Sequence, residues 1–181
     1  MEAFTEFFQE NPLATAFGAA GLLFQLTWPV FRAHRAIMTM QFGIGADYSL
    51  HYALLEAWSG AGVAGLGATQ SALAFFVGER PWFRWVGLSF LPMVAAVCWS
   101  TWDGLPTVFV FAAVSLIMIG RLQRDTLRLR IFLLSAAPFG MGYDIAVGAT
   151  PALIGGGVSA IIAAAMLIRE IRSRRQSVDA A

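Results

Sequence analysis

The sequence predicts an all-α integral membrane protein with seven transmembrane helices. Hydrophobic residues make up 58% of the 181 residues and charged residues only 13%, about half the charged fraction of a soluble domain. The apolar residues fall in runs that approach the ~20 helical residues needed to cross a hydrocarbon layer. These runs lack the polar–apolar alternation of membrane β-strands. A lipid bilayer is therefore the expected surrounding of most of the surface.

Seven apolar runs follow one another along the chain. Pro106 and Pro151 mark helix starts, because proline loses no helical hydrogen bond in a first turn. The second run carries Asp47 and His51 in its interior, and the fifth run is short. The predicted spans cover residues 13–31, 36–58, 60–78, 85–102, 105–120, 131–148 and 151–168.

All twelve basic residues are arginines, and they occupy alternate connections between the predicted spans. They are Arg32, Arg35, Arg80, Arg84, Arg121, Arg124, Arg128, Arg130, Arg169, Arg172, Arg174 and Arg175. Cytoplasmic loops of membrane proteins collect arginine and lysine. The pattern predicts an N-terminus outside and a cytoplasmic tail at residues 169–181. Glu2, Glu6 and Glu10 make the start acidic, so no cleavable secretory signal is expected.

A shift of the chain by 92 residues superimposes the first three spans on the last three. Leu13 then matches Leu105, and Arg32 matches Arg124. Because an extra fourth span restores the orientation of the second set, a parallel repeat is expected. The prediction is a 3+1+3 arrangement within one membrane domain, 1–181: a first three-helix repeat at 13–78, a linker helix at 85–102 and a second repeat at 105–168.

The third and seventh spans carry small residues at every fourth position, which permits close helix packing. These residues are Ala61, Gly65 and Thr69 in the third span, and Gly155, Ser159 and Ala163 in the seventh. Either these helices lie at the centre of each bundle, or the small residues reflect generic close packing.

Polar residues inside the second and sixth spans are the candidate functional residues, because polar groups in hydrocarbon usually face a cavity or a partner. Asp47, Tyr48, His51 and Tyr52 lie on one face of the second helix, while Tyr143 and Asp144 lie on the sixth. One interpretation is a substrate or proton site between the halves. The other is that His51 bonds an aspartate and locks helices together. Gln41 and Gln70 are further site candidates, or interhelical hydrogen-bonding residues.

Other chemistries find little support. The second histidine, His34, falls in a connection, and neither a metal site nor a cofactor is predicted. The C-terminal arginines suit anionic lipid headgroups, and nucleic acid is not expected as a partner. A remote alternative is an intramembrane aspartyl protease, in which two carboxylates share a proton. Residues 43–47 contain an extra residue relative to that family's glycine motif, and Tyr143-Asp144 comes second in the chain rather than first.

The stretch His51-Tyr52-Ala53-Leu54-Leu55, with Arg35 before it and Ala57 and Gly60-Ala61 after it, resembles the bacterial inner membrane protein family of the YgjV type. That family has a similar His-aromatic-x-Leu-Leu-Gly stretch. Residues 143–148 look like the counterpart in its second half. Glu56 stands where the family usually has glycine, and Gln70 stands near a position associated with arginine.

The layout also resembles the SWEET and PQ-loop transporter group, although Trp28-Pro29-Val30 has the proline without the glutamine. These resemblances imply a multi-pass protein of the bacterial inner membrane that moves a small polar, sugar-like solute. The alternative is a non-transporting scaffold or assembly partner. An enzyme is not expected, and association into a homo-oligomer is left open.

Overall fold

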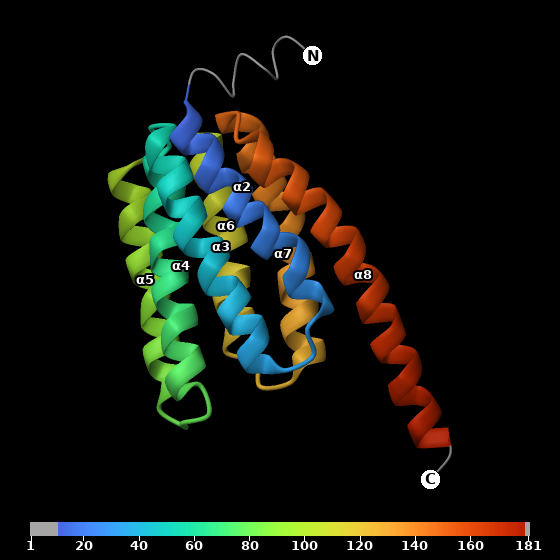
Figure 1. The fold of residues 1–181 in the computed structure, drawn as a ribbon. Coiled ribbons are helices and arrows are strands. Elements are labelled where there is room, and N and C mark those ends of the chain that lie inside the picture. Colours follow the sequence, from blue (N-terminus) through green and yellow to red (C-terminus); the bar gives the residue numbers. More distant parts are fainter. Residues whose placement is uncertain (1–10, 180–181) are drawn as a thin grey trace.

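The computed structural model describes residues 11–179, which form seven α-helices and contain no strand. The predicted all-α class is confirmed. The helices run alternately up and down side by side (Figure 1). They are α2 (Pro12–Thr27), continued by the 3₁₀ turn η1 (Trp28–Val30), α3 (His34–Leu54), α4 (Trp58–Val77), α5 (Phe83–Ser100), α6 (Leu105–Arg121), α7 (Thr126–Val147) and α8 (Thr150–Asp179). The acidic start at Glu2, Glu6 and Glu10 lies outside the described residues.

Apolar length distinguishes these helices. Within residues 11–179, four segments are long and apolar enough to cross a membrane: Pro12–Val30, Trp58–Val77, Phe83–Ser100 and Thr150–Ser173. The helix α6 is apolar but has only 17 residues. The other two, α3 and α7, have 21 and 22 residues and include the predicted polar positions. The helices α3 and α7 are therefore long enough to span a membrane, but their polar residues distinguish them from the four apolar segments.

The end of α3 differs from the prediction. This helix stops at Leu54, and α4 already begins at Trp58, whereas one span was expected to continue to residue 58. Between them Glu56 adopts a φ of 59°, in the left-handed region that favours glycine. A glycine, which the family resemblance led us to expect here, would adopt this backbone without steric cost.

The C-terminal segment is helical. Residues 169–181 were predicted to form a tail beyond the last span, and the helix α8 continues through this segment to Asp179. Residues 169–176, Arg-Glu-Ile-Arg-Ser-Arg-Arg-Gln, contain neither glycine nor proline and are mostly good helix formers. The last turns of α8 extend away from the other helices (Figure 1).

In each predicted three-helix repeat, the helix that comes second along the chain packs between the other two. The helix α3 packs between α2 and α4, and α7 packs between α6 and α8. The helix α5 contacts α4 and α6, while α4 meets α6 and α8 meets α2. The interpretation that the third and seventh spans lie at the bundle centres is therefore wrong.

The two small-residue stripes have different outcomes. In α8, Gly155, Ser159 and Ala163 are all buried, so this stripe does face other helices. In α4, Ala61 is buried, Gly65 is half-buried with Ser49 of α3 close to it, and Thr69 is exposed. The closest approach of α3 to α4 depends instead on Gly45, where an added Cβ would lie 2.8 Å from the backbone nitrogen of Ala68.

One end of the bundle collects most of the arginines. The connections at residues 31–33, 78–82 and 122–125 and the end of α8 all lie at this end (Figure 1). Arg32, Arg80 and Arg124 in these connections are exposed. We call it the basic end and the other the opposite end.

The contact at Gly45 gives a test of helix packing. Gly45→Ala should destabilise the protein by about 1–3 kcal/mol, because the methyl group would overlap the backbone of α4. The matched control is Gly140→Ala in α7, where an added Cβ would meet nothing within 4 Å. Melting temperatures in detergent should fall for the first variant and stay equal or rise for the second. Equal effects would refute the close approach of α3 and α4.

The backbone of Glu56 gives a second test. Glu56→Gly should be more stable than Glu56→Ala by about 1 kcal/mol, because only glycine adopts a positive φ without steric cost. Both variants remove the same carboxylate, so their difference in melting temperature isolates the backbone. If alanine were tolerated as well as glycine, the left-handed turn would be wrong.

Candidate functional site

A cavity of about 150 Å³ lies among α3, α4, α6 and α7. We call it the central cavity. Its middle is lined by apolar residues, including Val63, Val110 and Ala113. Its polar lining comes from α2, α3, α6 and α7: Gln25, Gln41, Tyr48, Tyr52, Arg121, Tyr143 and Asp144. A small set of polar groups in a mostly apolar hollow is typical of a ligand site.

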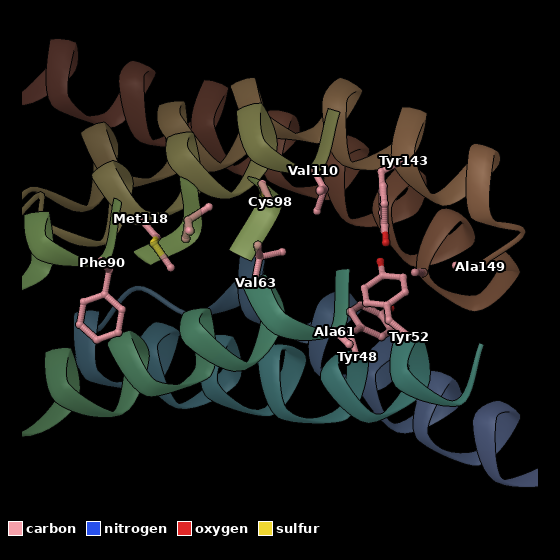
Figure 2. Packing of buried hydrophobic residues seen from close by; sticks show 12 residues of the cluster. Tyr48, Tyr52, Ala61, Val63, Phe90, Cys98, Val110, Met118, Tyr143 and Ala149 are labelled. Atoms are coloured by element: carbon pink, nitrogen blue, oxygen red, sulfur yellow. The ribbon is translucent and has the colours of Figure 1, made fainter. Parts of the chain in front are cut away.

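The three tyrosines and Asp144 gather toward the opposite end of the cavity. The Tyr52 hydroxyl donates to Asp144 Oδ1 at 2.5 Å, and the Tyr143 hydroxyl accepts from the Gly60 N–H at 2.9 Å. The rings of Tyr52 and Tyr143 meet edge to face, with centroids 5.5 Å apart. Figure 2 shows Tyr143 pointing from α7 toward Tyr52 on α3. These contacts join residues of the first three helices to residues of the last three.

A second hollow of about 110 Å³ borders this cluster at Asp144. It is lined mainly from α7 and α8 and shares Gln25, Gln41 and Asp144 with the central cavity. Gln25 also accepts a hydrogen bond from the Tyr48 hydroxyl. Asp144 therefore borders two cavities while holding a hydrogen bond to Tyr52.

His51 and Asp47 do not line the central cavity, although the His51 ring packs against the rings of Tyr48 and Tyr52, with centroids 6.1 and 5.6 Å apart. The His51 side chain is fully buried, and its Nδ1 lies 2.8 Å from the Ala14 carbonyl oxygen on α2. Asp47 is half-buried, and neither residue lines the central cavity. The predicted pairing of His51 with an aspartate is not formed in the described part of the chain. His51 instead connects α3 to α2 through a backbone carbonyl.

The two glutamines have different surroundings. Gln70 is buried and donates to the carbonyl oxygens of Gly87 at 3.1 Å and Met118 at 3.4 Å. It connects α4 to α5 and α6 and lines neither cavity. Gln41 lines both cavities, and its Oε1 accepts a hydrogen bond from Arg121 at 2.9 Å.

Arg121 is the site residue that sequence reasoning missed. It was predicted to be a loop charge, yet its side chain is only 5% exposed and lines the central cavity. It donates to the Gly67 carbonyl oxygen and to Gln41 Oε1, both at 2.9 Å. Among residues 11–179, no carboxylate forms an ion pair with it. The one sequence signal is that Arg121 directly continues the apolar run that ends at Gly120.

Arg130 is a second predicted loop charge that turns inward. It is 1% exposed and donates to the carbonyl oxygens of Pro29, at 2.6 Å, and Phe31. Its Nε lies 3.4 Å from Glu170 Oε2. Arg130 therefore joins α7 and α8 to the connection after α2, near the basic end.

The described residues do not bring together a metal site or a catalytic pair of carboxylates. No group of three or more His, Cys, Asp or Glu side chains that could hold a metal occurs within residues 11–179. Asp144 bonds Tyr52, while Asp47 lies outside both cavities. The arrangement is suited to binding a polar group through hydrogen bonds and charge.

Comparison with known proteins identifies a family. A family model described as bacterial inner membrane protein, Imp-YgjV, matches residues 12–174. No curated protein and no solved structure matches the chain. The matched segment begins with α2 and ends within α8. The protein therefore belongs to the Imp-YgjV family of bacterial inner membrane proteins.

Proposed function

We propose that this protein moves a small polar solute across the inner membrane through the central cavity. The observation that carries the proposal is the polar lining of a cavity inside an otherwise apolar bundle. Polar groups at membrane depth are costly and mark solute or ion pathways in many membrane proteins. Gln41, Arg121 and Asp144 are the central groups of the proposed site. Solute sites of transporters commonly lie where two structural repeats meet.

The helix pattern supports residues 13–78 and 105–168 as two repeats with α5 as the linker. α3 and α7 begin at residues 34 and 126, and α4 and α8 begin at residues 58 and 150. Both pairs differ by 92, the predicted offset. The contact of α4 with α6 has its counterpart in the contact of α8 with α2. Tyr52 and Asp144, which bond each other, are also 92 residues apart.

The arginine distribution supports an orientation with the basic end in the cytoplasm. Arg32, Arg80 and Arg124 lie in connections at the end where α8 also finishes (Figure 1). Arginine in short connections favours the cytoplasmic side. The start of α2 would then face the outside.

Transport can be tested by filling the cavity. Val114 on α6 lines the central cavity, so Val114→Trp should abolish uptake by proteoliposomes across a panel of sugars, amines and small acids. The matched control is Val108→Trp on the same helix, because Val108 is 45% exposed. This variant should keep wild-type uptake.

The outcome separates a transporter from its rival, a non-transporting scaffold or assembly partner. If neither the wild-type protein nor the two tryptophan variants move any of these solutes although all are folded, the scaffold is favoured. Unchanged uptake by Val114→Trp would refute the central cavity as the route.

A second pair of variants separates the site from the structural bonds around it. Asp144→Asn should reduce uptake at least about tenfold with little change in melting temperature, because the amide oxygen can still accept from Tyr52. His51→Ala should instead lower the stability by about 1–3 kcal/mol, because it removes a buried hydrogen bond to α2. Uptake and melting temperature should be measured on both. A reversed pattern would make His51 the site residue and Asp144 the lock.

A further inference from the structure

Arg121 is a buried cation that forms no ion pair with any carboxylate among the described residues, 11–179. A guanidinium has five N–H donors, and the bonds to Gly67 and Gln41 use two of them. Its Nε has no hydrogen-bond partner. Both partners are neutral, although a buried charge is normally compensated by an opposite charge, because its desolvation costs several kcal/mol. The cavity beside Arg121 is where such a charge could enter.

Arg130 shows the contrasting case in the same protein. It is as deeply buried as Arg121, yet Glu170 lies 3.4 Å from its Nε. It also lines neither the central cavity nor the second hollow. Arg130 is therefore compensated within the chain, whereas Arg121 borders a cavity and is not.

The surroundings of Arg121 on the other side are also basic. A hollow of about 430 Å³ at the basic end is lined by Arg121 together with His34, Arg35 and Arg124, with Glu79 as the acidic exception. Arg121 thus borders both this hollow and the central cavity. A cleft lined mostly by one sign of charge concentrates ions of the opposite sign.

We propose that Arg121 binds the carboxylate or phosphate group of a small anionic solute in the central cavity. The planar guanidinium offers parallel N–H donors that match either group. Gly67, which bonds Arg121, and Gly60, which bonds Tyr143, are seven residues apart on α4, or about 10 Å along the helix. The anionic group would lie at Arg121, and the polar remainder of the solute would face Tyr48 and Asp144. That the bound solute is then transported rests on the proposed function.

Binding can be measured without transport. Purified protein in detergent should be titrated with sodium acetate, sodium L-lactate and inorganic phosphate, with glycerol as a neutral probe, at constant ionic strength. A ligand that binds only the folded state raises the melting temperature. We expect a saturable rise with at least one of the anions and none with glycerol. Arg121→Gln should weaken this binding at least about tenfold, because a charged hydrogen bond is lost.

Two controls separate a solute in the cavity from a lipid headgroup at the surface. Arg128→Gln changes an exposed arginine that lines another hollow at the basic end, and it should leave the anion response unchanged. Added phosphatidylglycerol should not compete with the anion. If Arg128→Gln or the lipid abolishes the response while Arg121→Gln keeps it, the anion binds at the surface and the proposal is wrong.

If the Arg121→Gln variant does not fold, the same question is answered by chemical modification of the wild-type protein. Phenylglyoxal modifies guanidinium groups, and mass spectrometry of peptides can follow each arginine. A saturating anion should slow the modification of Arg121 and leave that of Arg124 and Arg128 unchanged. Equal modification of Arg121 with and without bound anion would overturn the proposal.

Failure of this inference differs from failure of the proposed function. Uptake of a neutral sugar with no anion response would leave transport standing and refute the anionic solute. An anion response that depends on Arg121, with no uptake of any solute, would leave the anion site standing and refute transport.

Discussion

Hydrocarbon offers no hydrogen bonds, so polar groups inside this bundle depend on partners within the protein, many of them on a neighbouring helix. The hydroxyl of Tyr52 finds Asp144, the imidazole of His51 finds the Ala14 carbonyl, and the Gln70 amide finds two carbonyls. The helices α3 and α7 carry many of these groups, and each packs along two neighbours: α3 against α2 and α4, and α7 against α6 and α8. The more apolar helices α2, α5 and α8 expose large hydrophobic side chains such as Leu23, Trp99 and Ile161.

The helices and part of the site could be predicted from the sequence, because both follow from local patterns. Apolar length gives seven helices, and helical spacing places Tyr48 and Tyr52 on one face of α3. Arg121 could not be found in this way. An arginine at the end of an apolar run has the same local pattern whether it extends into water or turns inward. Its direction depends on Gly67 and Gln41, which lie 54 and 80 residues away in the chain.

The small-residue stripes show the same limit for packing. A stripe of small residues identifies a helix that another helix can approach closely. Which residue lies at the contact depends on the position of the approaching helix. On α4 the predicted stripe ends at the exposed Thr69, whereas the contact with α3 falls where Gly45 meets the backbone at Ala64 and Ala68. On α8 the predicted residues are buried, and an added Cβ at Gly155 would meet Gln25 and Tyr48. The turn at Glu56 is another case, since its left-handed backbone follows from joining two packed helices.

A carrier of the proposed kind has to break contacts between its halves at one end and then at the other. At the opposite end these contacts are the bonds from Tyr52 to Asp144 and from Gly60 to Tyr143. Near the basic end they are the bonds from Arg130 to the Pro29 and Phe31 carbonyls. Both sets are present together here, with the central cavity between the first set and Arg121. The bonds of Arg130 have a guanidinium donor and the bond of Tyr52 has a carboxylate acceptor, so each end is held by at least one hydrogen bond to an ionisable group. An anion at Arg121 would leave the opposite-end contacts untouched, whereas a solute long enough to reach Asp144 would compete with Tyr52 for its oxygen. Solute length would thus determine whether binding also loosens the opposite end.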